Sequence, residues 1–276
     1  MSKVQVFKAR PASDGAGVKI NRVSHMSNPK LMDPFLMLDE IHSDQAEDYI
    51  EGFPPHPHRG FETVTVMLKG QMRHRDHLGN NGVIGSGGGQ WMMTGRGVIH
   101  SEMPEQEAGL LHGFQLWLNL AAKDKMKPAR YQDLQRQDWL EETVDGLVVR
   151  GIGGTLIVND QSLKAPVDSG KTRASVFTVA GKEGDHLTVS HPQNTKFFAY
   201  VYQGAVVLDG MHFERGNLII VEDTSQLELS LLETSGLLLL SGEPLNEPVA
   251  QYGPFVMNTM EEVEQALQDY REDNFV

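Results

Sequence analysis

The sequence contains no cysteine among its 276 residues. This absence excludes disulfide bonds and thiolate metal ligands, so any bound metal must be held by nitrogen and oxygen donors. No run approaches the ~18 apolar residues that cross a bilayer as a helix. The first ten residues, MSKVQVFKAR, contain no apolar signal region. We therefore expect a protein that does not contact the membrane and stays in the cytoplasm.

Basic side chains are also scarce. The chain has 24 lysines and arginines against 37 aspartates and glutamates, which gives a formal net charge of −13. Direct binding of nucleic acid normally needs a positive face, and no dense Lys/Arg cluster offsets the negative charge. We predict no direct contact with nucleic acid, although action through a partner protein is compatible with this charge.

The chain is rich in short segments with the character of β-strands. At about 150 residues per domain the length suggests two domains. Many short segments rich in β-branched and aromatic residues are separated by Gly, Asn, Asp and Ser turns, which indicates an all-β chain of antiparallel sandwiches or barrels. These segments include ETVTVML, VIGSG, GFQLWLNL, RASVFTV, FFAYVYQG and NLIIVE.

One helix is predicted at the end of the chain. Thr259 and Glu262 have the spacing of a capping box and precede VEQALQDY. A second stretch, from about Lys123 to Leu140, is charged and contains Pro128. We interpret it as a helical or irregular connection between two β domains, an N-terminal domain of residues 1–135 and a C-terminal domain of residues 136–276.

The two halves have the features of a degenerate repeat. The first half contains MLKGQMRHRD and then GSGGGQWM, and the second contains VYQGAVVLDG and then ERGNLIIVE. In both, a glycine ends a strand before a returning hairpin strand, and a second glycine precedes an apolar strand. Glycine suits such turns because they often require a positive φ.

Two spaced pairs of ligand-type residues stand out in FPPHPHRGFE and MTGRGVIHSEMP. His56 and His58 are two residues apart, as are His100 and Glu102. Residues two apart on a strand point to the same face, so two such pairs on neighbouring strands can converge on one ion. Imidazole and carboxylate ligands suit Fe(II), and also Mn, Co, Ni, Cu or Zn. Glu62 competes with Glu102 as the carboxylate, because it lies on the same face as the histidine pair if the strand is unbroken.

The order H-x-H-x3-E in residues 56–62 resembles the first motif of the cupin superfamily. Gly89, Gly95-Arg96-Gly97 and His100 resemble the second motif, with Gly95 where proline is usual. Residues 56–104 as a whole resemble the pirin family of two-cupin proteins. DPFLMLDE near the start and LLLLSGEPLNEPVAQYGPFVMNT before the final helix are also similar to that family. The resemblance therefore runs from about Asp33 to the C-terminus.

The resemblance implies a fold of two cupin-type antiparallel β-barrel domains, each a double-stranded β-helix, with a short C-terminal helix. It implies one divalent metal, Fe(II) first, held by His56, His58, His100 and Glu102, and it favours Glu102 over Glu62. Phe53, Arg59, Glu62 and Gln115 are the further candidates for the pocket.

Pirin relatives are associated with quercetin 2,3-dioxygenase activity. The resemblance therefore implies a flavonol-like enolic substrate and O2, with Glu102 as the catalytic base that takes the proton of the 3-hydroxyl group. The alternative that it implies is a non-catalytic, iron-dependent redox regulator that binds transcription factors or metabolic enzymes. We expect a monomer in either case.

The second half lacks the ligand pairs. His56 and His58 precede Gly70 by 14 and 12 residues, and the residues at the same distances before Gly204 are Ser190 and Pro192. The position that corresponds to His100 falls near Glu228. We predict a metal-free C-terminal domain. His74 and His77 are interpreted as solvated hairpin residues, and Trp91 and Trp117 as core residues.

Overall fold

A computed structural model describes residues 3–24, 28–190, 196–222 and 226–276 of the chain. The chain divides into two compact units. The first unit is Arg10–Arg136 with Leu245–Val276, and the second unit is Met1–Ala9 with Gln137–Pro244. The predicted domains were residues 1–135 and 136–276. The units differ from them at the two ends of the chain: Met1–Ala9 belongs with the second half, and Leu245–Val276 belongs with the first half.

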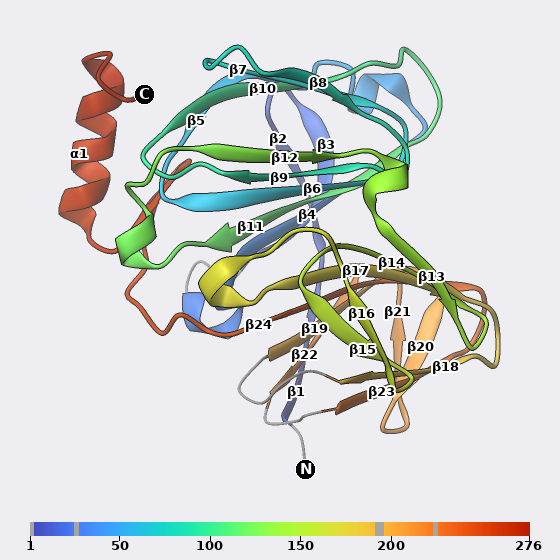
Figure 1. The fold of residues 1–276 in the computed structure, drawn as a ribbon. Helices are drawn as coiled ribbons and strands as arrows, with labels where there is room; N and C mark the ends of the chain where they lie inside the picture. The colour runs from blue at the N-terminus through green and yellow to red at the C-terminus, as the bar shows by residue number, and fades with distance from the viewer. Residues whose placement is uncertain (1–2, 25–27, 191–195, 223–225) are drawn as a thin grey trace. The chain divides into compact units, whose positions relative to one another are not determined.

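The regular structure of the described part of the chain is mostly strand (Figure 1), as the sequence predicted. The strands of the first unit are β2 (Arg10–Asp14), β3 (Val18–Ser24), β4 (Phe35–Ser43), β5 (Phe53–His58), β6 (Phe61–Lys69), β7 (Met72–Asp76), β8 (Asn81–Ile84), β9 (Gly89–Met93), β10 (Val98–Pro104), β11 (Leu111–Asn119), β12 (Arg130–Leu134), β25 (Ala250–Tyr252) and β26 (Phe255–Met257). The strands of the second unit are β1 (Lys3–Lys8), β13 (Leu140–Val144), β14 (Leu147–Gly153), β15 (Thr155–Val158), β16 (Gln161–Lys164), β17 (Ser175–Gly181), β18 (His186–Ser190), β19 (Lys196–Gln203), β20 (Ala205–Leu208), β21 (Met211–Glu214), β22 (Asn217–Glu222), β23 (Gln226–Leu231) and β24 (Ser235–Gly242). Short 3-10 turns lie at Pro29–Leu31, Ala46–Asp48, Ala122–Asp124, Arg136–Asp138 and Gly170–Thr172.

The one α-helix among the described residues is α1, Met260–Arg271. Thr259 accepts a hydrogen bond from the Glu262 amide, and the Glu262 side chain accepts one from the Thr259 amide, so the predicted capping box is confirmed. The helix buries Val263 and Ala266 against Phe255 and Phe275. No helix in the described ranges has the length and apolar character needed to cross a membrane.

The two units repeat one strand topology. The large sheet of the first unit has the order β12-β9-β6-β11-β4-β3-β2, and that of the second has β1-β22-β19-β24-β17-β14-β13. The small sheet β5-β10-β7-β8 of the first unit corresponds to β18-β23-β20-β21 of the second, which β15 and β16 extend. Gly70 and Gly204 occupy matching turns after β6 and β19, with φ of 93° and 72°. The loose sequence repeat thus corresponds to a repeated fold.

The segment from Lys123 to Leu140 is the connection that the sequence suggested, because the boundary between the two units falls between Arg136 and Gln137. It is largely irregular, with 3-10 turns at Ala122–Asp124 and Arg136–Asp138, but it also contains a strand. Its residues 130–134 form β12, which pairs with β9 from Arg130↔Met93 to Leu134↔Gly89 and completes the edge of the large sheet. The sequence did not indicate this strand, because an edge strand buries little of its surface, and only Leu134 of β12 is buried. Its composition therefore lacks the apolar alternation of an inner strand.

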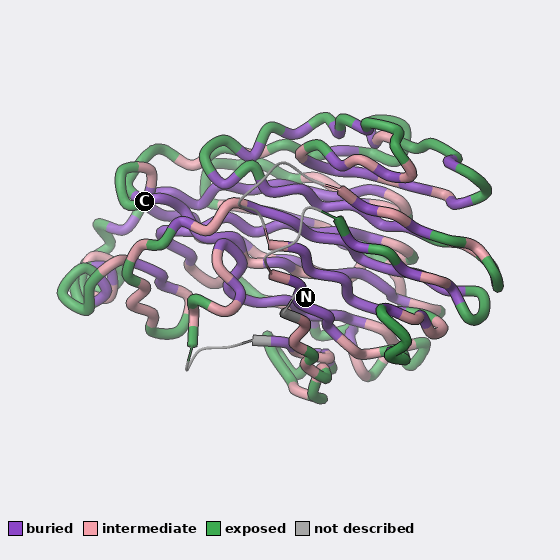
Figure 2. Tube along the Cα trace, turned by 90° about the horizontal axis from the view of Figure 1, so that it is seen from below, coloured by how far each residue is buried: buried purple, intermediate pink, exposed green. Residues whose placement is uncertain are grey.

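Apolar side chains from both sheets of each unit pack together between them. In the second unit Val149, Phe177 and Leu239 of the large sheet join Leu187 and Leu229 of the small sheet in one cluster. Figure 2 shows that burial follows the strands, while the turns are exposed. In the first unit the corresponding cluster is smaller, and part of the space between the sheets is open as the cavity described below.

Candidate metal centre and adjoining cavity

The histidine pair of β5 lies directly beside β10. The register is antiparallel, with His100 opposite His56 and Val98 opposite His58. Since alternate residues share a face, the three imidazoles project from the same side of the sheet. One nitrogen from each of His56, His58 and His100 lies within 4.8 Å of the others. The prolines of FPPHPH fit because β5 is the edge strand, where a missing N–H costs no ladder bond.

The three imidazoles can hold a metal ion. The Nδ1 of His56 lies 2.8 Å from the Pro54 carbonyl, so Nδ1 carries the proton and donates it, which leaves the Nε2 lone pair free. His56 Nε2 and His58 Nε2 are 3.0 Å apart. Two nitrogens bound at right angles to an ion, each about 2.1 Å away, would be separated by about 3.0 Å. The buried His100 Nε2 has no hydrogen-bond partner among the described residues, which is costly unless a ligand satisfies it.

Burial sets the protonation state of this group. It lowers the pKa of His58 well below its usual value, and the neighbouring His56 adds to the effect. Burial likewise lowers the pKa of His100, with further contributions from His58, His56 and His74. Both rings are therefore held neutral, which is the form that binds metal.

His74 supports the centre from the next strand. It lies on β7 opposite Glu102, is 1% exposed, and its Nε2 is 3.0 Å from His100 Nδ1. The prediction of a solvated turn residue was wrong for His74, although His77 is exposed. The period-two pattern of β7 was the signal that could have found it, because Met72 and His74 are buried while Arg73 and Arg75 point away.

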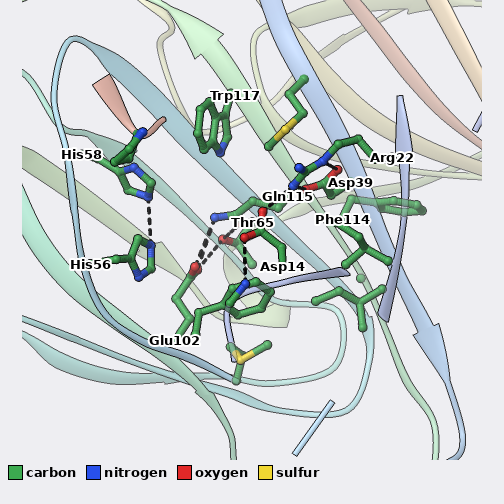
Figure 3. A pocket seen from close by; sticks show the side chains of 18 of the residues that line it. Asp14, Arg22, Asp39, His56, His58, Thr65, Glu102, Phe114, Gln115 and Trp117 are labelled. Carbon is green, nitrogen blue, oxygen red and sulfur yellow. Dashed lines mark hydrogen bonds and ion pairs between the residues drawn. The ribbon is translucent and has the colours of Figure 1, made fainter. Parts of the chain in front are cut away.

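Glu102 lies beside the three histidines but outside the group that their nitrogens form. It is 6% exposed, and Gln115 Nε2 donates to its two carboxylate oxygens at 3.2 and 3.4 Å. The Thr65 hydroxyl is 3.4 Å from the same carboxylate and 2.7 Å from Gln115 Oε1. Figure 3 shows the Glu102 carboxylate directed toward Gln115 and Thr65. Its position is thus held by neutral hydrogen-bonding side chains.

Glu62, the competing carboxylate, faces away from the centre. The strand is broken after His58, where Gly60 has a φ of 91° and β6 begins at Phe61. Thr65 and Met67 of β6 line the cavity, whereas Glu62 shares the opposite face with Trp91. Burial raises the pKa of Glu62 to about 7, against a lowering by its hydrogen bond to Trp91.

Arg59 also points elsewhere. It is buried, and it donates to the carbonyl oxygens of Arg96 and Phe275 and to the Asp269 carboxylate at 2.6 Å. Its guanidinium carbon lies 4.4 Å from the centre of the Phe275 ring. The prediction that Arg59 and Glu62 line the pocket therefore differs from the structure, which gives Arg59 the role of anchoring the C-terminal segment.

A cavity of about 770 Å³ adjoins the histidines and opens between the two sheets of the first unit. Phe53 and Gln115, two of the predicted pocket residues, line it together with His56, His58 and Glu102. Trp117, which we expected in the core, lines it as well, with its ring 5.4 Å from that of His58. Trp117 alternates on β11 with the buried Leu116 and Leu118. This pattern did not show that the face of the strand that carries Trp117 borders a cavity.

Comparison with known proteins agrees with this geometry. The Pirin family model matches residues 17–118, and the model of the pirin C-terminal cupin domain matches residues 176–276. The chain belongs to the pirin family. The Caulobacter vibrioides pirin-like protein is 41% identical over 281 residues, which cover 99% of this chain and 98% of that protein.

Other relatives of this chain are named for an activity. A Vibrio cholerae protein, provisionally named a quercetin 2,3-dioxygenase, is 45% identical over 273 residues, covering 98% of this chain and 96% of its own. The crystal structure of a quercetin 2,3-dioxygenase from Acinetobacter baumannii superposes with a TM-score of 0.90 at 31% identity, covering 100% of this chain and 98% of the other. The predicted fold of two cupin-type β-barrels is thereby confirmed.

Proposed function

We propose that this chain is a metal-dependent dioxygenase that cleaves flavonols of the quercetin type, with one Fe(II) ion held by His56, His58, His100 and Glu102. The observation that carries the proposal is the group of three imidazoles, two of them buried, with Glu102 beside it and an aromatic-lined cavity next to it. The names of the Vibrio and Acinetobacter relatives support the same substrate class. A bound divalent metal supplies Lewis-acid character to an enolic oxygen and, if redox-active, electrons for O2.

Glu102 is the residue that would take the proton of the flavonol 3-hydroxyl group. A general base must lie within hydrogen-bond reach of the proton that it accepts, and Glu102 lines the cavity beside the imidazoles. Gln115 donates to both carboxylate oxygens, so it keeps the carboxylate oriented before the substrate binds. Because the amide is neutral, this contact places no positive charge beside the carboxylate.

The cavity suits a flat aromatic substrate. Its volume of about 770 Å³ lies within the range of small-molecule sites, which is roughly 300–1,000 Å³. Phe53, Phe114 and Trp117 offer ring faces, and Trp117 is fixed by Phe61 at a centroid distance of 4.3 Å.

The test is oxygen uptake. Protein purified anaerobically and loaded with one equivalent of Fe(II) should consume O2 when quercetin is added and release one carbon monoxide for each O2. The variant His100→Ala should lose metal and activity together, whereas His77→Ala, at an exposed histidine in the turn between β7 and β8, should retain both. Full metal content without O2 consumption for any flavonol would refute the proposed function.

A further inference from the structure

A second polar group lies in the cavity, away from the imidazoles. Arg22 of β3 and Asp39 of β4 are opposite one another in the strand register, and both line the cavity. Figure 3 shows this pair on one side of the cavity and His56 and His58 on the other, with Gln115 and Thr65 between them.

The pair is rigidly built. Arg22 Nε donates to Asp39 Oδ1 at 2.8 Å, and Arg22 Nη2 donates to Asp39 Oδ2 at 2.6 Å, which is a bidentate arrangement. Asp39 is 6% exposed. Arg22 Nη2 also donates to Asp14, which lines the same part of the cavity. Packing and two-point bonding thus fix the orientation of a charged pair in a cavity that is otherwise largely apolar.

The pair retains hydrogen-bonding capacity for a ligand. Each carboxylate oxygen of Asp39 accepts one hydrogen bond from Arg22 and has a further lone pair. Arg22 Nη1 donates to none of the described residues, so its two N–H groups are available. An acceptor and a donor therefore lie next to each other, and a hydroxyl group can use both because it donates and accepts.

The local charge selects against an anion. Asp14 and Asp39 bring two negative charges to one guanidinium, which leaves a net charge of −1 at this end of the cavity. A carboxylate or phosphate on a ligand would be repelled there, and a methoxy group could accept a hydrogen bond but not donate one. A neutral phenolic hydroxyl meets both requirements.

We propose that Arg22 and Asp39 form a specificity subsite for the phenolic hydroxyl groups on the ring of the substrate farthest from the metal centre. The proposal rests on the proposed function, because it takes the ligand to be a flavonol whose enolic end lies at His56, His58 and His100. It adds that the chain distinguishes polyhydroxylated flavonols from those with a bare or methylated distal ring. The polar cross-strand row that starts at Arg22 and Asp39 continues through Gln115 and Thr65, so hydroxyl groups along one ligand edge have successive partners.

The test measures binding without turnover. The full-length protein is loaded with Zn(II), which has no redox chemistry, and titrated anaerobically with three flavonols. These are quercetin, galangin, which has no hydroxyl on the distal ring, and the dimethyl ether of quercetin at the 3′ and 4′ oxygens. Quercetin should bind about tenfold more tightly than either, as expected for one or two hydrogen bonds to a charged pair.

The variant Arg22→Met with Asp39→Leu removes both partners, so no buried charge is left unpaired. It should bind all three flavonols with similar affinity and keep its affinity for galangin.

The matched control is Arg150→Met with Glu141→Leu, an exposed ion pair of the second unit, which should keep the tenfold preference for quercetin. Equal affinities in the unchanged protein, no binding of any flavonol, or a double variant that keeps the preference would overturn the proposal. If the protein binds quercetin more tightly than the other two flavonols but the iron-loaded protein consumes no O2, the proposed function alone is refuted. If it consumes O2 but binds the three flavonols equally, the subsite alone is refuted.

Discussion

His74 Nε2 lies 3.0 Å from His100 Nδ1, and this contact orients the ring of His100. A partner on the far nitrogen of a ligating histidine fixes its tautomer and its direction. Replacement of His74 by Ala should therefore weaken metal binding by about 10- to 100-fold. Competition with a chelator would measure the Zn(II) affinity. His77→Ala is the control, because His77 is exposed on the same hairpin. An unchanged affinity in His74→Ala would show that packing alone orients His100.

The four proposed ligands should differ in importance. His56→Ala, His58→Ala and His100→Ala should each reduce the metal content to near zero, because each removes one of three converging nitrogens. Glu102→Gln should keep most of the metal and abolish flavonol cleavage, since the carboxylate lies outside that group and would serve as the base. Elemental analysis of each variant beside its O2 uptake would decide. Loss of metal in Glu102→Gln equal to that in the histidine variants would mean that Glu102 is an equal ligand.

Glu62 should make stability depend on pH. Burial raises its pKa to about 7 in the folded protein, from 4.5. The folded state therefore binds more protons than the unfolded state between these values, so the free energy of unfolding falls as the pH rises through this window. The difference is on the order of 3 kcal/mol for a shift of this size. Denaturant unfolding at pH 5 and pH 8 should show the fall in the unchanged protein and a flatter profile in Glu62→Gln. Parallel profiles in the two proteins would contradict the assignment.

Lys125 is buried, and its side chain joins three segments of the first unit by hydrogen bonds. Its Nζ donates to the Gly60 carbonyl at 2.7 Å, to Asn119 Oδ1 at 2.7 Å and to the Val256 carbonyl at 3.0 Å. Lys125→Met should leave three buried acceptors without a donor and lower the free energy of unfolding by about 3–5 kcal/mol. The exposed neighbour Lys123 offers the control variant Lys123→Met, which should unfold at the temperature of the unchanged protein. Equal melting temperatures for both variants would mean that water replaces the ammonium group.

Much of the architecture follows from local sequence. The alternation of apolar residues between glycine turns determined the strands, and the Thr259 and Glu262 pair determined where the last helix begins. The spacing of His56 and His58 put two imidazoles on one face of β5, because the side-chain period of a strand is two. These features depend on neighbours in sequence, so the sequence alone was sufficient for them.

The other features of the site depended on which strands pair and on which face of each strand borders the cavity. Glu62 was separated from His58 by a break at Gly60, His74 was brought under His100 by the pairing of β7 with β10, and Trp117 faced a cavity instead of a filled core. Arg22 and Asp39, 17 residues apart in the chain, became a bidentate pair only when β3 and β4 aligned. Cross-strand contacts of this kind arise from register and sheet order, which local side-chain patterns do not encode.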